Sequence, residues 1–329
     1  MFSEKLNAPL ALTFDDVLLV PASSLVEPNE ADIRTRFSRN IPMNIPLVSA
    51  AMDTVTESAM AIALAREGGI GVIHRNMSAE QEVAEVRRVK ESEQLIERKV
   101  LSVDPETSVA EVERLMVEHG IGGVPVVEAG KIVGIVSRRD VRAIATRRGN
   151  ENVRAIMTRD PITARENISM EQALETMYTN KVERLPVVDS EGHLIGIITM
   201  QDVLEKRQYP NATRDSQKRL RVAAAVGPFD FERAVRLDEC GADALVVDCA
   251  HGHNQNVVKS IRDIKGSVKA DVIAGNIATA AAAEDLVDTV DGLKVGIGPG
   301  SICTTRIVAG VGIPQVTAIA SVADVIRET

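Results

Sequence analysis

The sequence of 329 residues contains no tryptophan, and aromatic residues make up only 2% of it. Proteins that bind single-stranded nucleic acid stack the bases on aromatic side chains, so this scarcity argues against that class. The net charge of -9 also argues against a chain that coats nucleic acid or an anionic membrane, because an acidic surface attracts neither. We therefore expect no nucleic-acid partner and no membrane partner, and a small molecule as the ligand.

Cysteine is also scarce. The three cysteines, Cys240, Cys249 and Cys303, are too few and too clustered for a disulfide framework, which fits a reducing cytoplasm. No stretch reaches the roughly 18 uninterrupted apolar residues of a spanning helix, and the first residues carry no apolar run behind a basic flank. We expect a cytoplasmic protein in which at least one cysteine is chemically active and Cys240 serves packing.

Two parts of the chain alternate short apolar strands with helices. In the first part, PLVSAAM near Leu47 and GIGVIH ending at His74 flank a helix over 58–67. The same rhythm returns after Arg207, with helices over 231–240, 257–264 and 280–288 between further strands. Uninterrupted apolar strands separated by helices predict a parallel sheet covered on its faces. The six expected strands begin near Leu47, Gly71, Val222, Ala244, Asp271 and Leu293.

Between these parts, residues 93–207 contain two copies of one pattern. The first copy predicts a helix over 108–116, strands over 123–127 and 131–137, and a closing helix over 138–144. The second copy predicts the same elements over 169–177, 185–188, 193–199 and 200–204. Polar, charged flanks indicate crossings between separately packed bodies. The sequence thus predicts that 93–207 interrupts a domain formed by 1–92 and 208–329.

The duplicated unit resembles a tandem of cystathionine-beta-synthase (CBS) modules, a Bateman pair. This resemblance implies regulatory binding of purine nucleotides, with the aspartate of an S/T-x-x-D motif on the ribose hydroxyls. The motif is present as Ser137 to Asp140 and as Thr199 to Asp202. Alternatively, Asp140 and Asp202 only cap their helices, since aspartate is a preferred capping residue. The duplication does not define which nucleotide binds.

A glycine-rich stretch, Gly292 to Gln315, surrounds Cys303 with six glycines and two prolines. So many breakers after a strand predict a loop rather than a helix, on the face where βα barrels bind ligands. Free amides and Arg306 could hold Cys303 as the reactive thiolate. The alternative is that Cys303 is a small buried apolar residue, as a single cysteine without such neighbours usually is.

Six motifs together resemble the inosine monophosphate (IMP) dehydrogenase and guanosine monophosphate (GMP) reductase family. This resemblance implies a (β/α)8 TIM barrel interrupted by the tandem CBS pair, and the inserted pair favours the dehydrogenase because the reductases generally lack it. The motifs are LTFDDVLLVPA at 12–22, SAAMDTVTE at 49–57, GVIHRNM at 71–77, DCAHGH at 248–253, AGNIAT at 274–279 and GIGPGSICTTR at 296–306.

The resemblance also implies the chemistry. Cys303 would add to C2 of the hypoxanthine ring, hydride would pass to NAD, and the thioimidate would be hydrolysed to xanthosine monophosphate. Ser49, Met52, Asn276, Ser301 and Ile302 would bind IMP; Asp248, Gly296 and Gly298 would bind NAD; the carbonyls of Gly298, Gly300 and Cys303 would hold potassium. Homotetramers, or octamers through the inserted pair, are implied as well.

Several alternatives stay open. The chain could reduce GMP, or it could be a non-catalytic nucleotide sensor. Because a TIM barrel needs eight strands, we expect the 329 residues to be the front portion of a longer chain that could trap substrate without turning it over. Cys249, His251 and His253 indicate a turn beside the cofactor more than a zinc site. The run at 85–99 predicts a solvated helix face, and His74 could be a ligand contact or a structural residue.

Overall fold

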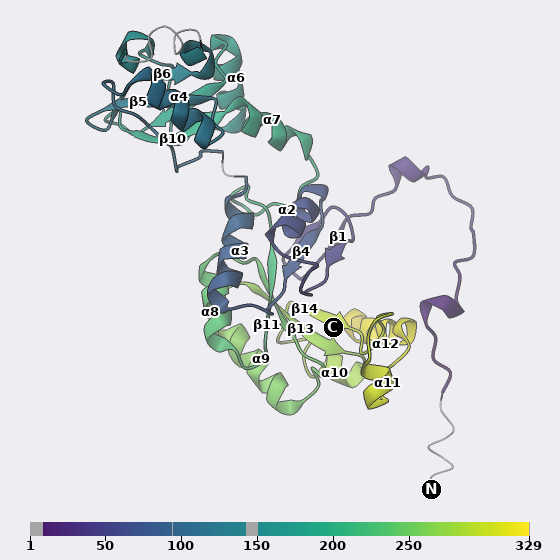
Figure 1. The fold of residues 1–329 in the computed structure, drawn as a ribbon. Coiled ribbons are helices and arrows are strands. Elements are labelled where there is room, and N and C mark those ends of the chain that lie inside the picture. Colours follow the sequence, from purple (N-terminus) through teal and green to yellow (C-terminus); the bar gives the residue numbers. More distant parts are fainter. Residues whose placement is uncertain (1–8, 94, 143–150, 329) are drawn as a thin grey trace. The chain divides into compact units, whose positions relative to one another are not determined.

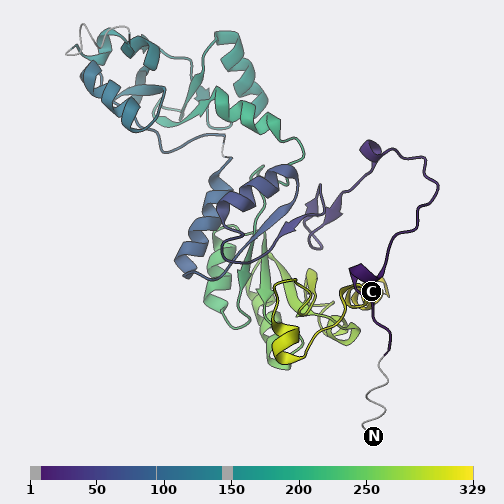
Figure 2. The same ribbon diagram turned by 45° about the vertical axis from the view of Figure 1, so that its right-hand side comes forward.

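The structure, a computed structural model, describes residues 9–93, 95–142 and 151–328 (Figure 1). The chain divides into two units, Met1–Ser92 with Asn211–Thr329, and Glu93–Pro210. Figure 2 shows the same ribbon from a second direction. Within the described residues, no helix is both long enough and apolar enough to cross a membrane.

A parallel sheet in the order β14-β13-β12-β11-β4-β3 forms the first unit. The sheet curls like part of a TIM-type barrel (Figure 1). Each strand falls where the apolar pattern places one, so the six-strand parallel sheet predicted above is confirmed for the described part of the chain. The strands are β3 (Val48–Ser49), β4 (Ile70–Ile73), β11 (Ala223–Val226), β12 (Ala244–Asp248), β13 (Asp271–Ile277) and β14 (Gly292–Val295).

Helices connect these strands, and several of them begin at a side chain that accepts a backbone N–H group. Ser78, Asp230 and Asn254 cap α3, α8 and α9 in this way. The helix predicted over 280–288 is shorter than expected, because α10 ends at Glu284. The helices are α2 (Ser58–Glu67), α3 (Ala79–Glu91), α8 (Phe231–Glu239), α9 (Gln255–Ser267), α10 (Ala280–Glu284) and α12 (Gln315–Glu328), and short 3-10 turns lie at Phe14–Asp16 and Pro28–Glu30.

A hairpin packs against the inner face of the sheet at the amino ends of its strands. The hairpin of β1 (Thr35–Arg36) and β2 (Pro42–Met43) contributes Ile41 and Met43 to the buried cluster there. Asn40 Nδ2 donates to Asp271 Oδ1 over 2.9 Å, which ties the hairpin to the start of β13. With the amino end filled, the loops at the carboxyl ends of the strands are the remaining place for a site. The cluster also contains Ile70, Val72, Ala223, Ala225, Ala244, Val246 and Ile273.

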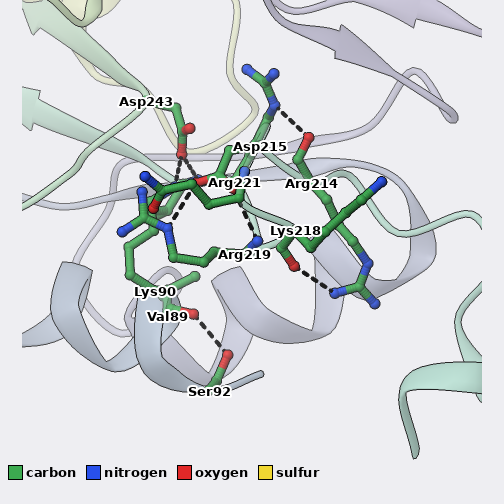
Figure 3. Close-up of polar contacts among 11 residues, drawn as sticks. Val89, Lys90, Ser92, Arg214, Asp215, Lys218, Arg219, Arg221 and Asp243 are labelled. Atoms are coloured by element: carbon green, nitrogen blue, oxygen red, sulfur yellow. Dashed lines mark hydrogen bonds and ion pairs between the residues drawn. The ribbon is translucent and has the colours of Figure 1, made fainter. Parts of the chain in front are cut away.

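The prediction of a solvated face over 85–99 is wrong for its helical part. Val86 and Val89 of α3 are fully buried, and Lys90 is 4% exposed. The ammonium of Lys90 lies between Asp215 and Asp243, at 3.2 and 2.5 Å (Figure 3). This charged stretch therefore contains a lysine that is buried and paired with two carboxylates. The amino-acid sequence alone does not distinguish such a lysine from one exposed to solvent.

The second unit contains two copies of one fold. Pro125 faces Ile135 in the first hairpin, and Pro186 faces Ile197 in the second, so the two copies share their register. The hairpin tips pair reciprocally, through Leu194 N–H to Gly130 O and Ile132 N–H to Gly192 O.

The elements of this unit follow the expected ranges closely. They are α4 (Val109–Glu118), β5 (Gly123–Glu128), β6 (Lys131–Ser137), a 3-10 turn at Val153–Ala155, β7 (Thr158–Arg159), β8 (Ala164–Arg165), α6 (Met170–Asn180), β9 (Arg184–Val188), β10 (Leu194–Thr199) and α7 (Met200–Gln208). Of the closing helix predicted over 138–144, residues 138–142 are helical and the rest lies outside the described residues. Each copy buries its own apolar cluster.

Candidate active site

Buried polar atoms without partners gather at the carboxyl end of the sheet. Ser49 Oγ at the end of β3, Asn276 Oδ1 in β13 and Gln315 Oε1 at the start of α12 have no hydrogen-bond partner among the described residues. Most buried polar atoms in folded proteins are paired, so each exception needs an explanation. A polar ligand bound at this end would supply the missing partners. Two of these residues, Ser49 and Asn276, are among those expected to bind substrate.

An open cavity of about 370 Å³ lies among the loops that follow β3, β4 and β12. Met52 and Asp248, expected to contact substrate and cofactor respectively, share this cavity. The volume is in the range of ordinary small-ligand sites. The structure therefore brings together residues that lie far apart in the sequence. The cavity is lined by Ala51, Met52, Asp53, His74, Arg75, Asn76 and Asp248.

His74 is a buried member of this cavity wall, only 4% exposed. Its Nδ1 accepts the backbone N–H of Asn76 over 3.1 Å, so the neutral ring carries its proton on Nε2. Nε2 lies 3.5 Å from Glu57 Oε1 and has no hydrogen-bond partner among the described residues. The structural role of His74 is supported by Nδ1, which accepts the Asn76 N–H. The role as a ligand contact is supported by Nε2, which has no hydrogen-bond partner among the described residues.

The cysteine loop follows β14 and contains a short helix, α11 (Thr305–Ala309). The expectation of a loop without a helix is therefore wrong here. The segment from Thr304 to Ala309 contains no glycine or proline, and the helix stops at Gly310, which adopts a φ of 65°. At Gly298, a β-carbon would lie 2.8 Å from Arg306 Cγ, so the loop closes tightly on this helix.

Thr305 is the immediate partner of the Cys303 sulfur. Sγ lies 3.2 Å from Thr305 Oγ1, and the Cys303 N–H donates to Gly300 O over 3.1 Å. Hydrogen bonds from the Thr305 hydroxyl and backbone N–H, with the charge of Arg306, lower the pKa of the Cys303 thiol. The sequence reasoning assigned this effect to loop amides and Arg306 and missed Thr305. The Arg306 guanidinium, whose charge contributes to this effect, also donates to Ile313 O over 2.7 Å.

The other two cysteines have the opposite electrostatic environment. Burial raises the pKa of Cys240 and of Cys249. The Cys240 thiol donates to Leu237 O over 3.2 Å, and the Cys249 thiol donates to Gly275 O over 3.3 Å. Thiolate is the nucleophilic form of cysteine, so Cys303 is the best nucleophile of the three.

A metal cluster around Cys249 is not present among the described residues. No group of three or more His, Cys, Asp or Glu side chains there could hold a metal ion. His253 Nε2 instead lies 2.9 Å from Oδ2 of Asp285, the residue that follows the last residue of α10.

Lys294 is a second residue that the sequence reasoning missed. Its Nζ lies 2.8 Å from Asp248 Oδ1, between β14 and β12. A lysine inside a strand of this sheet was a visible signal, because strands of a covered parallel sheet are mostly continuous apolar runs.

The loop carbonyls fit a hard cation by donor chemistry. The carbonyls of Gly298, Gly300 and Cys303 come from one short stretch of loop, 298–303, around the turn at 301–302, and oxygen donors of this type suit hard cations. Gly300 O accepts the Cys303 N–H and keeps a second lone pair. Ser301 and Ile302 are exposed on the same turn, and Gly296 leads into it from β14.

Asp140 and Asp202 occupy equivalent positions in the two copies of the second unit. Asp140 Oδ2 accepts the Ser137 hydroxyl at 2.6 Å and its N–H at 2.9 Å. Asp202 Oδ2 accepts the Thr199 hydroxyl at 2.6 Å and its N–H at 3.2 Å. Both carboxylates thus help to cap a helix, as the alternative reading requires. A nucleotide contact at either residue stays a prediction.

Comparison with known proteins identifies the family. Residues 11–329 match the family described as the IMP dehydrogenase / GMP reductase domain. The chain belongs to this family. It is 54% identical to an inosine-5'-monophosphate dehydrogenase of Halobacterium salinarum, over 98% of the chain and 66% of that relative. It is 53% identical to one of Methanocaldococcus jannaschii, over 100% of the chain and 67% of that relative. The chain thus spans about two thirds of the length of these relatives.

Solved structures of the reductase branch are also similar to this family member. GMP reductase C318A of Trypanosoma brucei aligns with a TM-score of 0.84 and 38% identity, over 99% of this chain and 75% of that one. The same enzyme in complex with guanosine 5'-triphosphate aligns with a TM-score of 0.86 and 39% identity, over 99% and 80%. These alignments cover 99% of the chain and therefore include the inserted unit, so its presence does not by itself exclude a reductase.

Proposed function

We propose that the chain catalyses the NAD-dependent oxidation of IMP to xanthosine monophosphate, with Cys303 as the nucleophile. The observation that carries this proposal is the environment of the sulfur. Of the three cysteines, Cys303 alone has a lowered pKa, and it lies on the loop that follows β14. The identity of 53–54% to two curated dehydrogenases supports IMP as the substrate.

In the proposed reaction, the Cys303 thiolate adds to C2 of the IMP ring and the C2 hydrogen leaves with its electron pair. Bound NAD supplies the acceptor for that hydride. The resulting thioimidate is then hydrolysed, which releases xanthosine monophosphate and regenerates the thiol. A covalent intermediate of this kind divides one difficult oxidation into two steps.

The chain's own residues bind and orient the reactants. Ser49 Oγ and Asn276 Oδ1, which have no partner among the described residues, offer hydrogen bonds to IMP together with Met52 and Ile302 as apolar contacts. Ser301 and the amides of its turn take the nucleotide phosphate. On the cofactor side, Asp248 accepts the ribose hydroxyls, and Gly296 and Gly298 let backbone approach the dinucleotide.

A potassium ion bound by the carbonyls of Gly298, Gly300 and Cys303 fits the donor chemistry of the loop. When bound, such a cation supplies a fixed positive charge that holds these carbonyls in place. Removal of potassium should then reduce the reactivity of Cys303, and sodium should restore it less well, because ions of different size fit a carbonyl cage differently.

The inserted unit is proposed to be a CBS-type pair that binds purine nucleotides and regulates the barrel. The support is its duplicated register and the matched positions of Asp140 and Asp202. Homotetramers, stacked to octamers through this unit, complete the proposal. Calorimetric titration with ATP and GTP tests nucleotide binding, in the wild-type chain and in the double variant Asp140→Ala with Asp202→Ala. Sedimentation of the same two proteins tests the oligomeric state.

The proposed reaction is tested by mixing the 329-residue chain with IMP and NAD. We expect a burst of NADH stoichiometric with the chain and a mass increase on the peptide that contains Cys303. Both should disappear in Cys303→Ser and persist in Cys240→Ser. Absence of the burst and of the adduct, with the chain folded, would contradict the proposal.

Reduction of GMP is the second candidate, favoured by the reductase structures at 38% and 39% identity. GMP with NADPH in the same experiment decides between the two. Consumption of NADPH without any reaction of IMP and NAD would assign the chain to the reductase branch.

A further inference from the structure

Asp248, Gly275 and Lys294 form a row across three neighbouring strands. Asp248 of β12 pairs with Gly275 of β13, and Gly275 pairs with Lys294 of β14. Residues paired in a parallel sheet present their side chains to the same face. The middle position has no side chain, and the Lys294 ammonium reaches Asp248 Oδ1 over 2.8 Å.

The glycine at 275 is what leaves this path open. A β-carbon placed there would lie 2.5 Å from Lys294 Cβ and 3.1 Å from Lys294 O. Contacts below 3.0 Å are not tolerated, so a larger residue would force Lys294 or the strand to move. The middle strand therefore has no side chain at the position that the long Lys294 side chain crosses.

The ion pair lies at the wall of the cavity described above. Asp248 lines that cavity, and its side chain is 27% exposed, whereas that of Lys294 is 41% exposed. A carboxylate offers about four lone-pair positions, so the contact with Lys294 leaves acceptors for a ligand. A carboxylate held by a charged partner loses less rotational freedom when a ligand binds than a mobile one does.

We propose that Lys294 is a positioning residue, which crosses Gly275 to hold the Asp248 carboxylate toward the ribose hydroxyls of the dinucleotide cofactor. This inference rests on the proposed function, because it assumes that Asp248 faces the cofactor. It adds that the orientation of Asp248 is set from β14, two strands away. Lys294 acts through Asp248 in this account and need not touch the ligand.

The test measures NAD binding by calorimetry in a Cys303→Ser chain saturated with IMP, so that no reaction occurs. The variants are Lys294→Met, Lys294→Arg, Gly275→Ala, Asp248→Asn and the double variant Lys294→Met with Asp248→Asn. Lys259→Met, an exposed lysine of α9, is the matched control. Circular dichroism establishes that each variant is folded.

Lys294→Met should weaken NAD binding about tenfold, the ratio expected for one charge-assisted hydrogen bond. Lys294→Arg should restore most of this affinity, and Gly275→Ala should lower it, while Lys259→Met should have no effect. Because Lys294 acts through Asp248, the double variant should bind NAD no more weakly than Asp248→Asn alone. IMP binding should be unchanged in the Lys294 and Lys259 variants.

Three results would overturn the inference. Wild-type affinity in Lys294→Met would show that the ion pair does not matter for the cofactor, and additive losses in the double variant would show that Lys294 acts independently of Asp248. Failure of the chain to bind NAD, while IMP still shields Cys303 from alkylation in the wild-type chain, would also refute the inference but leave the thiol proposal standing. Failure of IMP to shield Cys303 would instead contradict the proposed function itself.

Discussion

Replacement of Lys90 by methionine tests the buried ion pairs of α3. In the wild-type chain the ammonium lies 2.5 Å from Asp243 Oδ2 and 3.2 Å from Asp215 Oδ2, and Lys90 is 4% exposed (Figure 3). Methionine keeps most of the apolar stem but removes the charge. Asp243 then retains the Val222 N–H at 2.8 Å, and Asp215 retains Arg219 Nε at 2.9 Å. Removing one partner of a buried pair typically costs about 3–5 kcal/mol.

For a domain of this size class that cost corresponds to a fall of roughly 10 °C in Tm. Burial raises the pKa of Asp243 even beside Lys90, and loss of the ammonium should raise it further. A carboxyl whose pKa is higher in the folded state destabilises the fold as the pH rises above its unfolded value. The Lys90→Met chain should therefore be more impaired at pH 8 than at pH 5.

Urea unfolding followed by circular dichroism at both pH values measures this difference. Hydrogen exchange in peptides covering 221–248 localises it to the starts of β11 and β12. Lys259→Met, on the exposed face of α9, should change neither measurement. A loss below about 1 kcal/mol at pH 8, which is typical of an exposed pair, or an equal loss at both pH values, would refute the reasoning.

Three further predictions follow from the structure. Burial raises the pKa of Glu82 from 4.5 to about 7, although Arg233 opposes this shift. The free energy of unfolding should therefore fall by about 3 kcal/mol as the pH rises from 4.5 to about 7. Thermal melts at a series of pH values should show this fall in the wild-type chain and not in Glu82→Gln. Gly71→Ala should cost about 1–3 kcal/mol in urea unfolding, because its β-carbon would lie 2.6 Å from Ala61 Cα; an unchanged midpoint would contradict this close packing. Thr305→Val should shift the pH midpoint of Cys303 alkylation upward, and an unshifted midpoint would show that Thr305 does not stabilise the thiolate.

Much of the fold of both units could be predicted because its signals are local. The helix over Ser58–Glu67 and the strand over Lys131–Ser137 were predicted to the residue, since the apolar spacing and the breakers at their ends define both. The helix at Thr305–Ala309 was missed, because the density of glycines around it hid six residues without a breaker.

The parts of the site that escaped prediction depend on contacts across the fold. Lys294 and Asp248 are 46 positions apart in sequence and meet because Gly275 lies between their strands. The burial of Lys90 likewise depends on Asp215 and Asp243, which follow it by more than a hundred residues. The sequence does not show which lysine is buried, because an exposed lysine and a buried, paired lysine are the same residue type.

The most direct test of the central claim is the rate at which Cys303 is alkylated, measured by peptide mapping with and without IMP, with Cys249 of the same chain as an internal reference. We expect Cys303 to react faster than Cys249 at neutral pH, and we expect IMP to slow the reaction of Cys303 selectively. Equal rates at the two thiols, or a Cys303 rate that saturating IMP leaves unchanged, would contradict the claim.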